Sequence, residues 1–158
     1  MRTYGAVESL NPAIPRHAGM WPYSHIPFQW SVHRQLSPTE PLEHFEFLAD
    51  DDRDRREDFI RSLCNVLGRR GLIVVYNATF DRQRLRDLTD WFPDYSDKIA
   101  NIQHRLWDLL PFVRKHIYHP NFQGSYSLKD VVPALVPELT YDCMDVTHGG
   151  RPECYGIG

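Results

Sequence analysis

The chain has 158 residues, of which 42% are hydrophobic and 13% aromatic, so one domain with a packed core can form over residues 1–158. Its formal net charge is −3, which excludes a broadly basic nucleic-acid-binding surface and leaves room only for a local one. The sequence has three cysteines, no secretory signal and no apolar run of about 18 residues. We therefore expect a cytoplasmic protein with free thiols and no membrane partner.

The first third of the chain is patterned for strands. Residues 3–10, 28–36 and 43–49 have the alternation of a half-buried strand. The last two are separated by Ser37–Pro41, whose serine and prolines favour a turn, so they should form a hairpin. Between the first two strands, residues 11–27 contain four prolines and are expected to be a long loop.

The remainder alternates between helix and strand signals. Residues 72–76 form a continuous apolar run, which is typical of a strand buried on both faces. Four segments have helical spacing or capping signals: 59–67, 80–91, 95–107 and 127–135. This order predicts an α/β fold with a mixed sheet flanked by helices. The helix before residue 72 provides the crossover that would let strand 72–76 pair in parallel with the first strand.

Two carboxylates follow strand segments at places where a metal site can form. Glu8 lies near the end of the first strand, and Asp81 comes shortly after the apolar run that ends at Tyr76. A site for one or two divalent cations needs oxygen ligands from separate chain segments, held on rigid elements. We therefore expect Glu8 and Asp81 to converge at one end of the sheet.

The strings around these carboxylates resemble motifs of the DEDD 3′–5′ exonucleases, which have a ribonuclease-H-like fold. Tyr76-Asn77-Ala78-Thr79-Phe80-Asp81, followed by Leu85, is similar to their second motif. Ala6-Val7-Glu8-Ser9 is similar to their first motif, Asp-X-Glu-Thr, with an alanine in place of the first aspartate. Tyr126–Asp130, leading to Leu135, resembles the helix before their third motif.

A closer resemblance, over nearly the whole chain, is to an uncharacterised bacterial family catalogued as domain of unknown function 2779. Five strings carry it: Asn11–Pro15, Ile26–Gln29, Asp108–Pro111, Tyr118–Pro120 and Gly124–Leu128. Membership implies the ribonuclease-H-like fold and implies no particular activity. The third exonuclease motif would follow residue 158, so we expect the domain to be C-terminally incomplete.

These resemblances imply Mg²⁺ or Mn²⁺ held by Glu8 and Asp81. Two of the four expected carboxylates are missing, so binding should be weak or absent, because Mg²⁺ depends on several anionic ligands. The leading hypothesis is a divergent metal-dependent 3′–5′ exonuclease-like domain for single-stranded DNA or RNA, inactive as this chain. Restoring aspartate at position 6 and extending the chain past Gly158 should together recover cleavage. The alternative is a non-catalytic interaction module that keeps the fold.

Other residues have both a structural and a functional interpretation. Asn77 either caps the following helix or contributes to the site. Trp21 and Tyr23 either stack on a nucleic-acid base or cover the core. Asp108 either orients a loop near the site or is structural, and the structural role is favoured.

Two strings have the Tyr-X-X-X-Asp spacing that puts both side chains on one face of a helix, and so imitate part of the missing third motif. They are Tyr126–Asp130 and Tyr141–Asp145. The better interpretation of the first is that Tyr126 packs and Asp130 is a solvated helix residue. The spacings of the histidines and cysteines near the C-terminus do not match the usual zinc patterns.

Overall fold

A computed structural model describes residues 1–51 and 53–138 of the protein. The chain divides into two compact units, residues 1–109 and 110–158. None of the helices in the described ranges is both long and apolar enough to span a bilayer.

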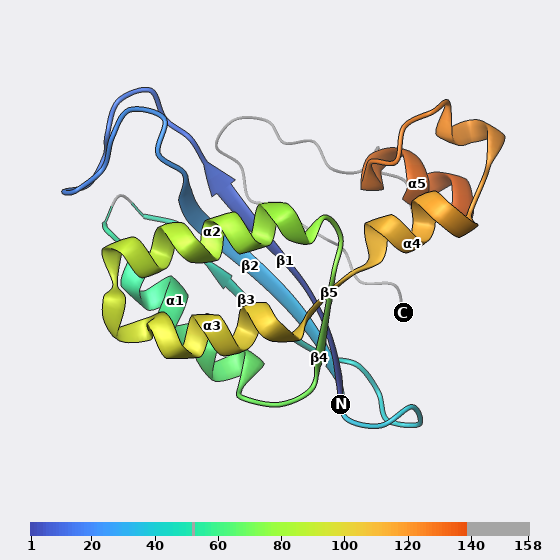
Figure 1. The fold of residues 1–158 in the computed structure, drawn as a ribbon, viewed down its shortest axis with the longest axis horizontal. Coiled ribbons are helices and arrows are strands. Elements are labelled where there is room, and N and C mark those ends of the chain that lie inside the picture. The colour runs from blue at the N-terminus through green and yellow to red at the C-terminus, as the bar shows by residue number, and fades with distance from the viewer. Residues whose placement is uncertain (52, 139–158) are drawn as a thin grey trace. The chain divides into compact units, whose positions relative to one another are not determined.

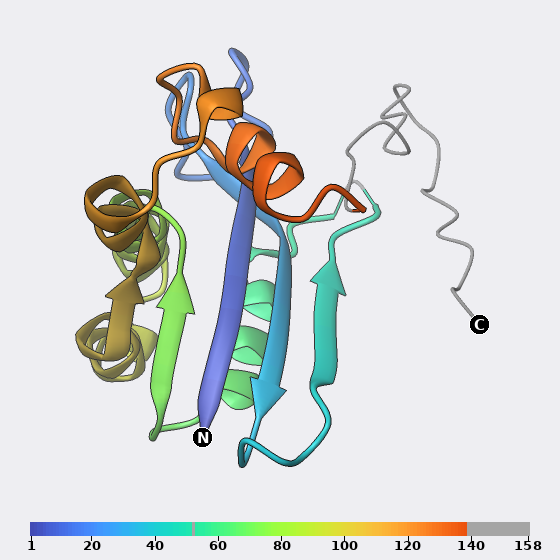
Figure 2. The ribbon, with the colours of Figure 1, turned by 90° about the vertical axis from the view of Figure 1, so that its right-hand side faces the viewer.

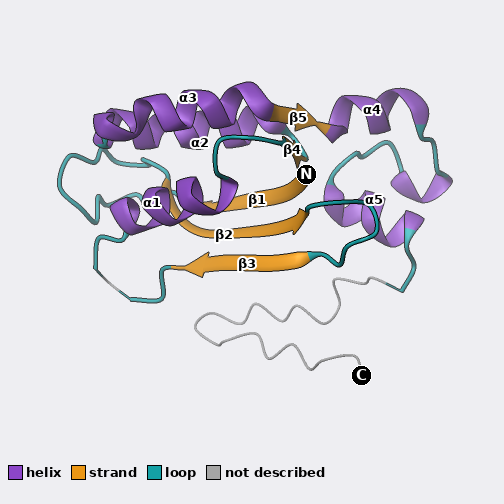
Figure 3. Cartoon of the chain, turned by 90° about the horizontal axis from the view of Figure 1, so that it is seen from below, coloured by secondary structure: helices purple, strands orange, loops and turns teal. Residues whose placement is uncertain are grey.

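The first unit is built on a five-stranded mixed sheet. Its strands, in chain order, are β1 (Arg2–Leu10), β2 (Ile26–Gln35), β3 (Glu43–Leu48), β4 (Leu72–Val75) and β5 (Leu106–Asp108). The spatial order is β3-β2-β1-β4-β5, and Figure 3 shows the first three side by side. β2 pairs antiparallel with both β1 and β3, whereas β4 pairs in parallel with β1 and β5 (Figure 2). The predicted hairpin and the predicted parallel pairing are both confirmed.

Three helices pack on one face of this sheet: α1 (Arg56–Leu67), α2 (Ala78–Trp91) and α3 (Ser96–Arg105). α1 contacts β2 and β3, while α2 and α3 run alongside each other over β1, β4 and β5 (Figure 1). α1 ends at Gly68, whose φ of 53° lies in the left-handed region that glycine adopts freely. The helices enclose one apolar core with the sheet, and its fully buried members include Phe59, Ile73, Leu88 and Ile99.

The opposite face of the sheet is exposed along β1 and partly exposed along β2 and β4. Along β1, residues alternate between the core side, which includes Thr3, and an exposed side. In β4, Ile73 and Val75 are buried but Leu72 is 44% exposed. The prediction that residues 72–76 are buried on both faces is therefore wrong. A continuous apolar run does not distinguish a strand covered on both faces from one that keeps apolar residues on its open side.

The second unit contains α4 (Leu109–His116), a short 3₁₀ helix η2 (Pro120–Phe122) and α5 (Leu128–Leu135). Tyr126 packs edge-on against the buried Phe122, with ring centroids 5.7 Å apart. Asp130 is exposed and accepts hydrogen bonds from the hydroxyls of Ser125 and Ser127. The interpretation that Tyr126 packs and that Asp130 is a solvated helix residue is therefore confirmed. The second string, Tyr141–Asp145, lies outside the described residues.

The boundaries differ from prediction between residues 95 and 116. The predicted helix over 95–107 ends at Arg105, and Leu106 takes φ −68° and ψ 124°, which begins β5. β5 has three residues, too few to show the period-2 pattern of a strand. The helix predicted from the preceding spacing was therefore extended into it. The sequence did not predict α4, which has Pro111 in its first turn, a position where proline is tolerated.

Candidate carboxylate site

Three carboxylates lie where the three parallel strands of the sheet end. Glu8 is close to the end of β1, Asp81 is in the first turn of α2 directly after β4, and Asp108 is the last residue of β5. Because β1, β4 and β5 are parallel neighbours, their carboxyl ends meet at one edge of the sheet. The expected convergence thus involves Asp108 as well as Glu8 and Asp81.

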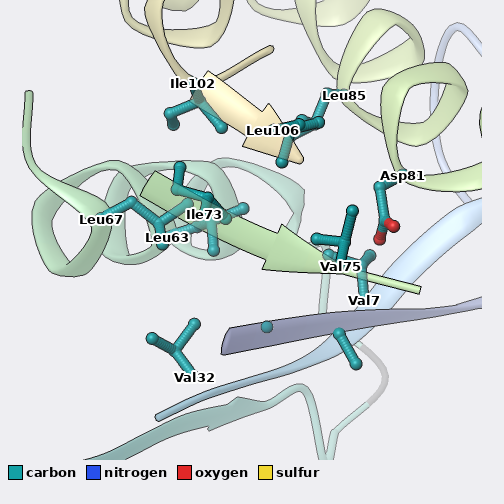
Figure 4. Close-up of a pocket in the computed structure, with 12 residues that line it drawn as sticks. Val7, Val32, Leu63, Leu67, Ile73, Val75, Asp81, Leu85, Ile102 and Leu106 are labelled. Carbon is teal, nitrogen blue, oxygen red and sulfur yellow. The ribbon is translucent and has the colours of Figure 1, made fainter. Parts of the chain in front are cut away.

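Asp81 is a buried acid, with only 6% of its surface exposed. Its side chain lines a cavity of about 30 Å³ whose other lining residues are apolar or glycine. In Figure 4 its carboxylate oxygens point toward Val75 and Val7, and the other labelled side chains are aliphatic. Asp81 is therefore not the solvated first-turn acid that a helix dipole alone would favour.

Burial is the main cause that raises the pKa of Asp81 to about 7, and the charges of Asp108 and then Glu8 act in the same direction. Removing a carboxylate from water penalises its charged form, and nearby like charges add to the penalty. Asp81 is consequently shared between its protonated and ionised forms near neutral pH. Asp108 and Glu8 therefore both lie within electrostatic range of Asp81, and we call these three residues the carboxylate cluster.

Asp108 has a defined structural role within this cluster. Its Oδ1 accepts the backbone N–H of Asn77 at 3.0 Å, and its Oδ2 accepts the N–H of Ala78 at 2.9 Å. An anion at a helix N-terminus satisfies donors that have no partner within the helix and complements the helix dipole. The end of β5 thus caps α2 in place of a residue adjacent in sequence.

Asn77 does not cap α2 with its own side chain. Its backbone has φ 70° and ψ 62°, and its side chain makes no cap hydrogen bond. Asparagine tolerates this left-handed conformation better than most residues, which explains why it can stand at the sharp turn between β4 and α2. The capping interpretation is therefore wrong in its mechanism, and a site role for Asn77 stays a prediction.

Glu8 lies on the open side of the sheet. It is exposed and shares that side of β1 with Ala6, two residues earlier. The pairing between β1 and β2 shifts register between Glu8 and Ser9, an irregularity of the kind that redirects side chains near functional sites. An aspartate at position 6 would therefore lie beside Glu8 on the same face.

As donors, these carboxylates fit Mg²⁺ or Mn²⁺ in kind, because hard cations prefer oxygen ligands. Their number, however, is smaller than the set of oxygen ligands on which such a cation usually depends. Both oxygens of Asp108 are engaged by backbone N–H groups, and Ala6 contributes no ligand. Within residues 1–51 and 53–138, no three Asp, Glu, His or Cys side chains are arranged to hold a metal ion.

Trp21 and Tyr23 lie on the loop that follows β1, with 78% and 66% of their surfaces exposed. The structural interpretation, in which they cover the core, is therefore wrong, and the neighbouring Met20 is the buried residue. Their stacking role stays a prediction.

The fold and the site define an α/β protein with a mixed five-stranded sheet and a carboxylate cluster at the ends of its parallel strands. The sequence profile of the family described as Domain of unknown function (DUF2779) matches residues 6–127, and the chain belongs to that family. The matched range contains all three carboxylates of the cluster. The comparisons with curated proteins and with solved structures gave no match.

Proposed function

We propose that this protein is a divergent, ribonuclease-H-like relative of the DEDD 3′–5′ exonucleases, with a degenerate cation site and negligible nuclease activity of its own. The observation that carries the proposal is the meeting of Glu8, Asp81 and Asp108 at the carboxyl ends of three adjacent parallel strands. Repelling carboxylates, one of them buried, are expected where a cation binds, since a cation relieves the repulsion. The parallel pairing of β1 with β4, which places Glu8 near the start of α2, is the one predicted from the crossover helix in the sequence.

In this proposal Glu8 and Asp81 hold the cation. A bound divalent cation supplies an activated water and neutralises charge on a phosphodiester. Asp108 supports Asp81 by fixing the start of α2 with its two backbone hydrogen bonds. The substrate class is single-stranded DNA or RNA.

A second candidate function is a non-catalytic interaction module. Two observations favour it for this chain: Ala6 occupies the position of the first motif's aspartate, and both oxygens of Asp108 are already used in capping α2. Both candidates predict low activity, so cation binding distinguishes them.

We expect no nucleotide release above a chelator blank when the protein is incubated with labelled single-stranded DNA or RNA and Mg²⁺ or Mn²⁺. Ala6→Asp should raise Mn²⁺ affinity by about tenfold, because each added carboxylate contributes a ligand and negative charge. It should restore little cleavage by itself, since residues that act as a unit are strongly non-additive. Calorimetric Mn²⁺ titration measures the first effect.

The matched control is Ala6→Asn, which adds an amide of the same size without the charge and should leave Mn²⁺ affinity nearly unchanged. Robust metal-dependent cleavage by the unmodified protein would show that the count of ligands is wrong. Failure of Ala6→Asp to strengthen Mn²⁺ binding would favour the interaction module.

A further inference from the structure

The loop between β1 and β2, residues 11–25, exposes large apolar side chains that lie mostly outside the core. Ile14 and Trp21 are 79% and 78% exposed, and Tyr23 is 66% exposed. Single exposed apolar residues are ordinary, but three in one 15-residue connection form a group. Loops that carry exposed aromatic side chains on a rigid scaffold are frequent binding elements.

This loop is fixed to the body of the first unit at several points. Arg56, only 4% exposed, donates a hydrogen bond to the carbonyl of Ala18 at 3.1 Å and lies 4.4 Å over the ring of Trp91. Met20 is buried. At the end of the loop, the His25 ring bonds the Ser9 hydroxyl at 3.0 Å and packs edge-on against Phe80. Trp21 and Tyr23 are therefore presented by an anchored segment.

Tyr23 occupies a backbone conformation that does not suit it. Its φ of 62° lies in the left-handed region, where a bulky aromatic residue is an outlier and glycine is favoured. Its backbone N–H donates to the carbonyl of Pro12 at 2.9 Å, an interaction that any non-proline residue could make. An exposed tyrosine kept at such a position points to a use for its side chain outside the fold.

The composition and position of the loop favour one class of ligand. Residues 11–25 contain Arg16 and two histidines and no acidic residue, although the whole chain carries a net charge of −3. The loop begins directly after β1, which carries Glu8, and its last residue contacts Phe80, which precedes Asp81. Flat aromatic rings and a cationic side chain carried on the same loop suit unpaired bases and their phosphates.

We propose that loop 11–25 is a stacking clamp for single-stranded nucleic acid, in which Trp21 and Tyr23 stack on unpaired bases and Arg16 contacts a phosphate. The inference takes its ligand class from the proposed function, but it requires neither a metal ion nor cleavage. Binding therefore persists in the presence of a chelator, and it can succeed where the cation site fails.

The test measures binding of fluorescently labelled oligo(dT) and oligo(U) by anisotropy, in buffer containing chelator. Trp21→Leu/Tyr23→Leu, which keeps the apolar character but removes the rings, should weaken binding at least tenfold, given about 1–3 kcal/mol for each stacked base. Trp21→Phe/Tyr23→Phe should retain most of the affinity. Tyr118→Leu, at a tyrosine 83% exposed outside the loop, is the matched control and should bind as the wild type does.

Tyr23→Gly separates a binding role from a structural one. Glycine adopts a φ of 62° without strain, so thermal stability should be unchanged or higher while binding weakens. A clear loss of stability in Tyr23→Gly would assign Tyr23 to the fold and overturn the clamp.

Three other results would also overturn it: no binding of either oligonucleotide by the wild type, equal binding by the double leucine variant, or stronger binding to anionic phospholipid vesicles that the leucine variant retains. The last would show that the loop inserts apolar side chains into a lipid surface. Loss of Mn²⁺ binding at Glu8 and Asp81 with oligonucleotide binding intact would reject the cation site and leave the clamp standing.

Discussion

Asp81→Asn should stabilise the protein at pH 8 by up to about 4 kcal/mol and have little effect near pH 4. Folding raises the pKa of Asp81 from 3.8 to about 7, and a pKa difference of one between the folded and unfolded states corresponds to about 1.4 kcal/mol. Because the folded-state pKa is the higher one, the folded protein binds this proton more tightly. Its contribution to stability is complete below about pH 3.8 and is lost as the pH rises toward 7. An asparagine side chain does not ionise, so the variant does not lose stability from this cause as the pH rises.

Urea unfolding of the wild type and Asp81→Asn at intervals between pH 4 and pH 8 measures this difference. Asp97→Asn provides a matched control, since Asp97 is an exposed first-turn acid of α3. It should lower stability at pH 8 by about 0.3–1 kcal/mol through the helix dipole, the opposite sign. If Asp81→Asn is destabilising at pH 8, the ionised Asp81 carboxylate makes a favourable interaction, and the assignment of Asp81 as a strained, buried acid fails.

Asp108→Ala should destabilise the protein by about 2–3 kcal/mol, because it leaves the backbone N–H groups of Asn77 and Ala78 without their acceptor. Ala78 is completely buried, so water cannot readily replace the carboxylate. The same substitution removes a charge that raises the pKa of Asp81, so that pKa should fall. Asp108→Asn keeps one acceptor oxygen and should cost less stability while producing a similar fall in pKa.

Denaturant unfolding at pH 7 measures the loss of stability in the two Asp108 variants. The pH dependence of stability measures the fall in the pKa of Asp81, because that pKa sets the pH at which stability is lost. A cost below about 0.5 kcal/mol for Asp108→Ala would mean that α2 does not depend on this cap. An unchanged pKa of Asp81 in both variants would separate Asp108 from the cluster.

The sequence predicted β1 to β4, the hairpin of β2 with β3 and the parallel pairing of β1 with β4, because alternation, turn chemistry and a crossover helix are local signals. It missed β5, so it favoured a structural role for Asp108 without identifying the capping of α2. Leu106-Trp107-Asp108 is too short for a period, and its position beside β4 depends on packing against a strand distant in the sequence. An acid that ends an apolar segment, as Asp108 does, was the one available signal.

The site could be predicted only in part for a related reason. Motif resemblance selected Glu8 and Asp81, and the structure places both beside the same edge of the sheet. Burial of Asp81 and the backbone role of Asp108 depend on tertiary contacts that no spacing of residues encodes. The left-handed conformation of Tyr23 likewise could not be predicted from the proline-rich sequence of its loop.

The most direct test of the cation site is Mn²⁺ titration of nitrogen-15-labelled protein, followed by amide NMR. Paramagnetic Mn²⁺ should broaden the signals of Glu8, residues 77–81 and Asp108 before others, and Mg²⁺ in excess should reverse the effect. Glu8→Gln/Asp81→Asn should abolish the local broadening. Broadening that starts instead at another acidic surface, such as the segment around Asp51 and Asp58, or that is unchanged in the double variant, would contradict a cation site at the ends of β1, β4 and β5.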